Sequence, residues 1–522
     1  MSPELERILE GKRAFRKKLA EKPVAEKLHI VEELAERTLA TRKDTSAGLP
    51  EEPWQTPKNW RWSRMGDVAT IIGGSTPRTD RAEYFGGDIP WITPADLSKY
   101  NAKTISRGAR NITKDGLENS GARLLPPGAV LFSSRAPIGY VAIAANPVAT
   151  NQGFKSFVLR DELIPDFVYY YLQRAKEFAV ALASGTTFLE ISSKNAARLP
   201  IPIPPLGEQR RIVAEIEKQF TRLEAGVAAL RRVQANLKRY RAAVLKAACE
   251  GRLVSTEAEL SRSQPSTKNS QPAYETGEAL LARILTERRQ NWQGSGRYKE
   301  PAAPNTANLP QLPEGWTWAQ FGYLGKDPFN TVQTGPFGAQ LHNTEFTESG
   351  VPVIAVGNLT GTGFRTDGLY FVSATKAKQL ARYDVWAGDL LFARSGATLG
   401  KVCVAPEAVQ DWRMTGHILR ARLNQNFINP KIAVYALAAL PAVRKQVFGN
   451  VRGVTRPGFN TGLLESILIP IPPLTEQTRI VAEVERRLSV VEELEAVVSA
   501  NLQRASSLRQ SILKKAFSGE LI

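Results

Sequence analysis

The chain has 522 residues, of which 43% are hydrophobic, so it is long and apolar enough to form several folded domains. Its 69 lysine and arginine residues outnumber its 51 aspartate and glutamate residues. The resulting formal net charge of +18 favours a polyanionic partner such as nucleic acid. Two cysteines and three histidines are too few and too scattered for a disulfide framework or a structural zinc site.

The N-terminal region predicts a cytoplasmic protein without a membrane partner. It is charged throughout and lacks the apolar core of a signal peptide. No part of the chain reaches about 18 uninterrupted apolar residues, the length that suggests a membrane span. We expect residues 1–50 to form an N-terminal helical extension that is interrupted near Pro23.

Residues 54–205 have the pattern of a basic, globular α+β domain. They open with the paired-tryptophan motif NWRW and continue as short apolar runs broken by Gly, Pro, Asn and Asp, which are strand and turn signals. Strand candidates lie at 88–93 and 128–135, and residues 165–183 have a helical pattern. We expect the strands to form a strongly bent sheet.

The loops of this first domain carry side chains that can read DNA bases. In the major groove, arginine pairs bidentately with guanine, and asparagine or glutamine with adenine. Taken singly, each residue is better explained as a solvated side chain or a phosphate contact, so only their grouping predicts DNA binding. The candidates are Thr76, Arg78, Arg107, Arg110, Ser134, Arg135, Asn151 and Gln152.

Residues 206–254 predict one long helix. The preceding PIPPL stretch cannot lie inside a helix because proline lacks an N–H, and Glu208 then falls in a first turn, where a carboxylate suits the helix dipole. Apolar residues recur at spacings of three and four as far as Val244, and Gly251 marks the end. A helix of about 40 residues is about 60 Å long, which suits a coiled-coil arm.

The region between the two predicted long helices consists of two segments, residues 255–312 and residues 313–473. The first segment is polar and rich in Ser, Pro and Asn, which predicts a linker with a short helix near 277–292. The second repeats the pattern of the first domain and opens with GWTW. Its strand and helix candidates are 350–356, 388–396 and 430–447.

This second domain is also basic, and its loops carry a similar set of polar side chains. The same chemistry predicts base or phosphate contacts, again from the group and not from any single residue. The candidates are Gln333, Thr334, Gln340, Asn358, Arg394, Ser395, Arg452 and Arg456.

A long repeat organises the whole chain. PIPPLGEQRRIVAEIE at 202–217 reappears 268 residues later as PIPPLTEQTRIVAEVE, and a second long helix is predicted over 474–522. A period of this length indicates a duplicated half-molecule. Duplicated halves are commonly related by a pseudo-two-fold axis, so we expect the two helices to pack as an antiparallel coiled coil. The charges allow this, with Arg231 and Arg232 opposite Glu492, Glu493 and Glu495.

Catalytic motifs are not evident. SGATLGKV at 395–402 has the wrong glycine spacing for a phosphate-binding loop and lacks the Ser or Thr after lysine. The Asn-Pro-Pro-aromatic tetrapeptide of amino-methyltransferases does not occur, and nothing favours a Ser-His-Asp or metal site. We therefore expect a binding protein without a cofactor or metal of its own.

The motifs together resemble the specificity subunits of type I restriction-modification enzymes. The doubled PIPPLxEQxRIVAExE motif before long helices carries the resemblance. So do GGSTPRTDRAEYFGGDIPWITPADL (Gly73–Leu97) and TGPFGAQLHNTEFTESGVPVIAVGNL (Thr334–Leu359), which are similar to the openings of the family's target recognition domains. The resemblance extends from about Trp54 to Ile522.

The resemblance implies two α/β target recognition domains, each reading one half of a split double-stranded DNA target. The domains would be separated and joined by the helices at 206–254 and 474–522, which set the unread spacer. Since the domains differ in sequence, the target is expected to be asymmetric. The main departure from the family pattern is the extension at 1–50, of which we expect residues 3–42 to pack on the central helices or on a modification subunit.

The resemblance also implies partners. Two modification subunits, which bind S-adenosylmethionine and methylate adenine, would dock on the helices. Motor and nuclease subunits, which use ATP and magnesium, would join through the complex, so these cofactors belong to the partners. Two other hypotheses remain: a methyltransferase or nuclease with its own recognition domains, and a coiled-coil scaffold without DNA specificity.

Overall fold

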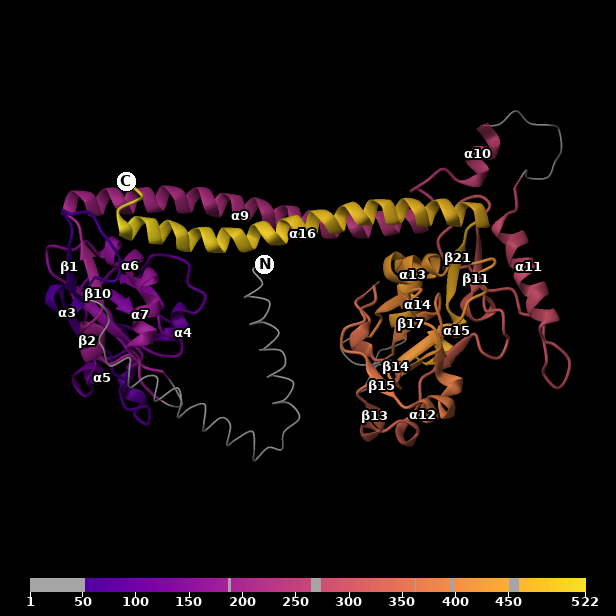
Figure 1. The fold of residues 1–522 in the computed structure, drawn as a ribbon, viewed down its shortest axis with the longest axis horizontal. Coiled ribbons are helices and arrows are strands. Elements are labelled where there is room, and N and C mark those ends of the chain that lie inside the picture. The colour runs from indigo at the N-terminus through magenta and orange to yellow at the C-terminus, as the bar shows by residue number, and fades with distance from the viewer. Residues whose placement is uncertain (1–51, 186–188, 264–273, 362, 395–398, 450–459) are drawn as a thin grey trace. The chain divides into compact units, whose positions relative to one another are not determined.

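The computed structural model describes residues 52–185, 189–263, 274–361, 363–394, 399–449 and 460–522. These form two compact units, one ending at Val227 and completed by residues 502–522, the other spanning residues 228–501. Two long helices, α9 (Leu206–Cys249) and α16 (Leu474–Ser518), contribute a segment to each unit (Figure 1). The predicted extension at 1–50 lies outside the described residues.

The first unit has mixed helix and sheet content. Its strands form three sheets, ordered β1-β10, β2-β9-β6-β7-β4 and β5-β3-β8, so the expectation of one bent sheet is wrong. The strands are β1 (Arg61–Arg64), β2 (Ala69–Gly73), β3 (Phe85–Ile92), β4 (Thr104–Ile105), β5 (Arg110–Ile112), β6 (Val130–Phe132), β7 (Val141–Ala144), β8 (Ala149–Thr150), β9 (Lys155–Leu159) and β10 (Pro200–Ile203). The helices are α3 (Met65–Val68), α4 (Pro94–Leu97), α5 (Lys114–Glu118), α6 (Pro165–Arg174), α7 (Lys176–Ala181) and α8 (Ser193–Ala197).

The second unit is built in the same way. Its sheets are β11-β21, β12-β20-β17-β18 and β13-β15-β14-β19-β16. The strands are β11 (Thr317–Gln320), β12 (Val332–Thr334), β13 (Phe346–Thr347), β14 (Val351–Ile354), β15 (Tyr370–Val372), β16 (Asp384–Val385), β17 (Leu390–Ala393), β18 (Val402–Val404), β19 (Trp412–Met414), β20 (Ile418–Ala421) and β21 (Leu468–Ile471). The helices are α10 (Glu257–Ser263), α11 (Gly277–Gln290), α12 (Ala374–Gln379), α13 (Pro430–Ala439), α14 (Pro441–Phe448) and α15 (Thr461–Ser466).

Strand pairing relates the two units. The order β2-β9-β6-β7 in the first corresponds to β12-β20-β17-β18 in the second. Each unit also has one parallel pair in its other sheet, β3 with β8 and β14 with β19. Each closes with an antiparallel pair that joins the paired-tryptophan segment to the PIPPL lead-in, β1 with β10 and β11 with β21. The duplication seen in the sequence is therefore a duplication of fold.

The observed helices differ from the predicted ranges. The two long helices end at Cys249 and Ser518, before the predicted ends at 254 and 522. The stretch at 165–183 is divided into α6 and α7, and the stretch at 430–447 into α13 and α14. Pro441 explains the second break, because proline disfavours helical geometry in the residue before it. The segment before 277 contains a further helix, α10, which was not predicted. Within the described part of the chain, no helix combines the length and apolar character needed to cross a membrane.

The Glu-Gln pair inside the repeated motif makes equivalent contacts in the two units, which explains why the motif occurs twice. Glu208 accepts a hydrogen bond from the indole of Trp60 at 2.9 Å, and Glu476 accepts one from the indole of Trp316 at 2.9 Å. Each carboxylate lies in the first turn of its long helix, where the helix dipole favours negative charge. In both units this bond ties the start of the helix to the start of the recognition fold.

The neighbouring glutamines make a second matched connection. Gln209 and Gln477 are fully buried. The Gln209 side chain accepts the backbone N–H of Ile164, just before α6, at 3.0 Å. Gln477 accepts the N–H of Asn429, just before α13, at 2.9 Å. A buried backbone N–H must find a partner, so these glutamines hold the loop that leads into each unit's helix pair.

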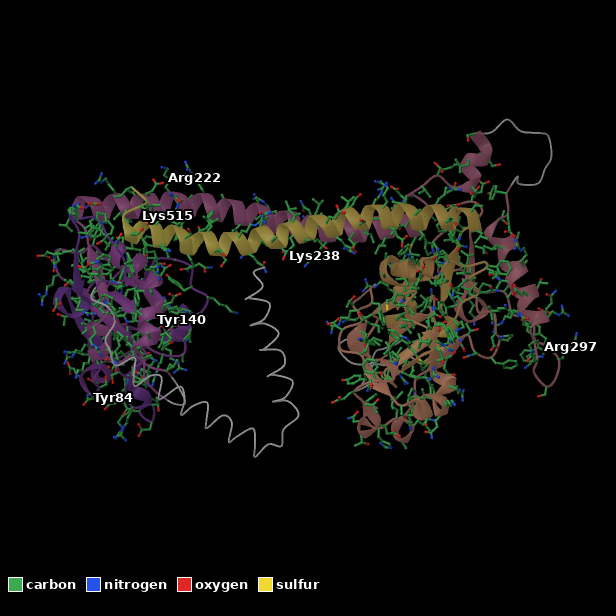
Figure 2. The ribbon with its side chains drawn as sticks, in the orientation of Figure 1. Tyr84, Tyr140, Arg222, Lys238, Arg297 and Lys515 are labelled. Atoms are coloured by element: carbon green, nitrogen blue, oxygen red, sulfur yellow. The ribbon has the colours of Figure 1, made fainter. Side chains whose placement is uncertain are left out.

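In the first unit, the segments of α9 and α16 share a hydrophobic core. Ile216 and Phe220 of α9 lie in the same buried cluster as Phe517 of α16. The Arg509 guanidinium lies 4.1 Å from the centre of the Phe220 ring. Arg222 projects from the outer surface (Figure 2). The apolar stripe is therefore buried on this part of the helices.

In the second unit, the charge pairing differs from the expectation. Arg241, and not Arg231 or Arg232, pairs with Glu492 at 3.6 Å and Glu495 at 3.3 Å. The two predicted arginines are exposed because their positions on α9 face solvent. Helix spacing predicts which residues share a face, but the rotation of that face toward its partner depends on packing.

Candidate nucleic-acid interface

Three loops of the first unit meet where β2, β6 and β8 end. The backbone N–H of Ser75 donates to Thr150 O at 2.9 Å, and the N–H of Ser134 donates to Gly153 O at 2.7 Å. These bonds fix loops that are far apart in the sequence against one another. This first loop cluster comprises residues 74–78, 133–137 and 150–154.

The first loop cluster brings together six of the eight site residues predicted for this unit. The hydroxyl of Thr76 donates to the side-chain oxygen of Gln152. Asn151 uses its side-chain oxygen to accept the Gly153 N–H at 3.0 Å. Arg135 is half-buried beside Glu190. Amide, hydroxyl and guanidinium groups therefore lie on adjoining loops, as base recognition requires.

Two predicted residues of this unit behave differently. Ser134 is fully buried, and no hydrogen-bond partner of its hydroxyl is present among the described residues. It is therefore unable to reach a DNA base, and its assignment as a contact residue is wrong. Arg78 is exposed and pairs with Asp80 at 2.8 Å, and this hydrogen bond raises the pKa of Arg78. Part of its charge is already neutralised.

Arg107 and Arg110 line a shallow cavity of 410 Å³ beside the cluster. The cavity is floored by backbone at Gly86 and Gly87, and no ion pair of either arginine occurs among the described residues. Arg110 lies opposite Trp91 in the β3-β5 pair, and Trp91 donates its indole N–H to Ser75 O at 3.0 Å. The cationic cavity therefore adjoins the first loop cluster. Its two arginines are the type of side chain that binds phosphate groups.

The second unit has an equivalent second loop cluster. The Gly335 N–H donates to Ile418 O at 3.0 Å, and the Arg394 N–H donates to His417 O at 3.1 Å. The latter bond corresponds to the one made by Ser134, so Ser134 and Arg394 occupy the same position in the two units. The second loop cluster comprises residues 334–338, 394 and 415–417.

A matched pair of glycines allows both clusters to close. A Cβ atom on Gly74 would lie 2.0 Å from Asn151 O, and one on Gly335 would lie 2.1 Å from Thr415 O. Both distances are far below van der Waals contact. Glycine is therefore required at each position by the close approach of a neighbouring loop.

Arg394 is the best-oriented cation of the second loop cluster. Its Nη1 donates to the Thr334 hydroxyl at 2.8 Å, and its guanidinium carbon lies 4.9 Å from the centre of the Phe337 ring. Phe337 is 55% exposed. Sequence reasoning predicted Thr334 and Arg394 but missed Phe337. The available signal was an aromatic residue between glycines in TGPFG.

Two other predictions for this unit are wrong because the side chains are buried. Gln333 is 9% exposed, and its side-chain oxygen accepts a bond from Arg382 at 3.2 Å. Asn358 is 1% exposed, and its side-chain oxygen accepts the Ala355 N–H at 2.8 Å. Both residues support loops. Gln340 is exposed and accepts the Tyr383 hydroxyl at 2.8 Å. The remaining predictions, Ser395, Arg452 and Arg456, lie outside the described residues.

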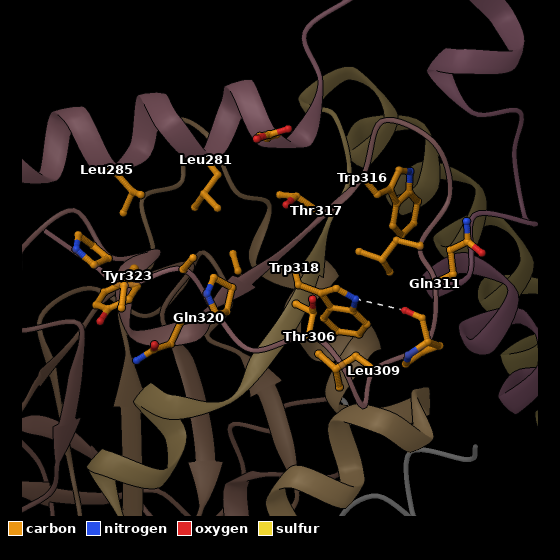
Figure 3. Close-up of a pocket in the computed structure, with 18 residues that line it drawn as sticks. Leu281, Leu285, Thr306, Leu309, Gln311, Trp316, Thr317, Trp318, Gln320 and Tyr323 are labelled. Atoms are coloured by element: carbon orange, nitrogen blue, oxygen red, sulfur yellow. Dashed lines mark hydrogen bonds between the residues drawn. The ribbon is translucent and has the colours of Figure 1, made fainter.

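Helix α11, from the segment predicted as a linker, is packed into the second unit. Leu281 and Leu285 face Trp318 and Tyr323 across a cavity of 630 Å³ (Figure 3). Arg288 is buried and donates to Gly325 O, Pro328 O and the Thr331 hydroxyl, each at 3.1 Å. Burial lowers the pKa of Arg288. These bonds hold the loop that enters β12, which ends at Thr334 in the second loop cluster.

The fold and the two loop clusters define a binding protein with two related recognition units. A model of the family described as the type I restriction modification DNA specificity domain matches residues 57–229 and 338–496. The chain belongs to this family. It is a non-catalytic, DNA-recognising specificity subunit of a type I restriction-modification system.

The chain is also similar to curated relatives, and its fold is similar to that of a solved structure. The MjaIX specificity subunit of Methanocaldococcus jannaschii is 28% identical over 425 residues, covering 80% of this chain and 84% of that protein. The EcoKI specificity subunit of Escherichia coli is 23% identical over 479 residues, covering 89% and 90%. A chain from a solved structure, described as "Structural basis underlying complex assembly and conformational transition of the type I R-M system", matches with a TM-score of 0.63 and 18% identity. It covers 90% of this chain and 100% of that chain.

Proposed function

We propose that the chain reads an asymmetric, bipartite double-stranded DNA target, with one half-site for each recognition unit. One observation carries this proposal: the two loop clusters share a backbone hydrogen-bond frame but carry different side chains at equivalent positions, such as the buried Ser134 and the half-buried Arg394. A shared frame presents its loops in a similar way, and different side chains select different bases. The two half-sites are therefore expected to differ.

The DNA contacts are proposed to come from exposed and half-buried side chains of the two loop clusters, from Gln340 close to the second cluster, and from the cavity beside the first cluster. In the first unit, Arg107 and Arg110 bind phosphates, because their cavity is cationic and lined by backbone. Base contacts in both units come from the side chains that converge on the loop clusters. These are Thr76, Arg135, Asn151, Gln152, Thr334, Gln340 and Arg394.

The long helices are proposed to form an antiparallel coiled coil related by a pseudo-two-fold axis. Helix α9 has 44 residues, and a straight helix of this length spans about 66 Å. The helices would set the number of unread base pairs between half-sites and would bind two modification subunits. Restriction subunits would join through the complex. These functions place the chain on cellular DNA, in the cytoplasm.

Single-molecule methylation mapping tests the proposal. DNA from cells expressing the full chain with its modification subunit is compared with DNA from cells that lack only this chain. We expect adenine methylation at one asymmetric two-part motif with a fixed gap, dependent on this chain. If the complex forms but no such motif appears, the proposal of a bipartite DNA target is wrong and a scaffold function takes its place.

A further inference from the structure

Uncharged groups orient the Arg394 side chain for ligand binding. Its side chain is half-buried, one N–H bonds to the Thr334 hydroxyl at 2.8 Å, and its plane lies beside the exposed Phe337 ring. No carboxylate pairs with it in the part of the chain that the structure describes. The guanidinium is therefore fixed in position while its positive charge stays uncompensated.

Other arginines of the same unit are neutralised. Arg413 pairs with Asp411 at 2.6 Å, and Arg422 pairs with Asp389 at 2.7 Å. Both pairs are partly or fully buried and stabilise strands of the unit. Arg394 differs from them because its partners orient the side chain without supplying negative charge. This difference distinguishes Arg394 from these structural arginines of its own unit.

We infer that Arg394 reads a guanine in the half-site of the second unit, an inference that rests on the proposed function. A guanidinium offers two parallel N–H donors that match the O6 and N7 acceptors of guanine in the major groove. The bond to Thr334 occupies one donor of Nη1, and the remaining N–H groups are sufficient for a bidentate contact. The Phe337 ring restricts the rotation of the guanidinium plane, which lowers the entropy lost on binding.

The equivalent position in the first unit lacks this chemistry. Ser134 is fully buried and cannot make a bidentate contact. Guanine recognition at this structural position is therefore confined to one half-site. A substitution of Arg394 should alter that half of the motif and leave the other half unchanged.

The test uses the full chain in complex with its modification subunit, together with duplexes that carry the motif found by methylation mapping. Each guanine is replaced in turn by 7-deazaguanine, which lacks the N7 acceptor. With the wild-type chain, we expect the replacement at one guanine of one half-site to weaken binding about 5- to 150-fold. With Arg394→Gln, binding should already be weak and should no longer respond to that replacement.

Two further variants distinguish base reading from phosphate binding and from unfolding. Arg394→Lys keeps the charge but loses the planar fork, so it should relax the motif at that guanine. Arg289→Gln removes an exposed charge on α11 that pairs with Glu300, and it should leave the motif unchanged. The inference is overturned if Arg394→Lys retains the full motif, or if Arg394→Gln weakens all duplexes without coupling to any guanine. Absence of a bipartite motif with the wild-type chain would instead overturn the proposed function.

Discussion

Glu476, a fully buried carboxylate, accepts the Trp316 indole at 2.9 Å and the backbone N–H of Glu257 at 3.0 Å. The first turn of α16, the opening of the second recognition fold and the start of α10 are joined at this one side chain. Burial raises the pKa of Glu476, and the two hydrogen bonds only partly oppose this effect. The connection is therefore sensitive to pH.

The raised pKa of Glu476 predicts a loss of stability as the pH rises. The native state holds this proton more tightly than the unfolded chain, whose reference pKa is 4.5. The contribution of Glu476 to the free energy of unfolding is thus greatest below about pH 4.5 and is lost as the pH rises through the raised pKa. Urea unfolding of the wild type and of Glu476→Gln between pH 4.5 and 7.5 measures this. A stability difference that is constant across the range would contradict the prediction.

The buried glutamines of the repeated motif are expected to be sensitive to substitution. Gln209→Leu and Gln477→Leu each leave the N–H of Ile164 or Asn429 without its partner. An unsatisfied buried polar group costs about 1–3 kcal/mol, and chemical denaturation should show a loss of this size in each case. Gln510→Leu, at an exposed position on α16, is the matched control and should change stability by less than about 0.5 kcal/mol. Equal effects at all three positions would argue against the proposed role.

Gly74→Ala and Gly335→Ala are expected to distort the two loop clusters. The added methyl group would meet Asn151 O or Thr415 O, so the loops must separate, at a cost of about 1–3 kcal/mol. We expect lower thermal stability and weaker DNA binding. Gly226→Ala lies in α9 with no atom near the new methyl group, and it should stabilise the helix by about 1 kcal/mol. Normal DNA affinity of the Gly74 and Gly335 variants would show that the clusters tolerate separation.

Arg107 and Arg110 are expected to contribute to affinity without selecting sequence. Neutralising one phosphate contact should reduce the slope of log affinity against log salt concentration by about 1. Arg107→Gln and Arg110→Gln should therefore weaken binding to motif and non-motif duplexes alike, measured by fluorescence anisotropy from about 50 to about 300 mM salt, a range over which screening increases. Arg289→Gln provides the charge-matched control. A changed methylation motif would indicate base reading by these arginines instead.

Much of the architecture could be predicted from local patterns. The long helices, the PIPPL lead-ins and most strand candidates follow from the period of apolar residues and from proline and glycine positions. The doubled motif also indicated a duplicated fold, which the equivalent strand orders confirm. Predictions of this kind succeed because helix and strand periods are properties of a few neighbouring residues.

The exposure of the candidate contact residues depended on tertiary structure. Ser134, Gln333 and Asn358 have the polar side chains expected at a DNA interface, yet each is buried by loops distant in sequence. Phe337, an apolar residue, is exposed beside Arg394. Composition and spacing therefore pointed to loops that the fold brings together, but not to which side of each loop faces solvent.

The sequence by itself determined the duplicated plan, the basic character and the helices, because these depend on charge and on short-range periodicity. Only the tertiary structure decided that Arg241 pairs across the helices and that α11 completes the second unit. It also decided that Ser134 and Arg394 occupy equivalent positions in the two units, and that Ser134 is fully buried while Arg394 is half-buried. The physical reason is that burial and pairing arise from contacts between segments far apart in the chain, which no local pattern records.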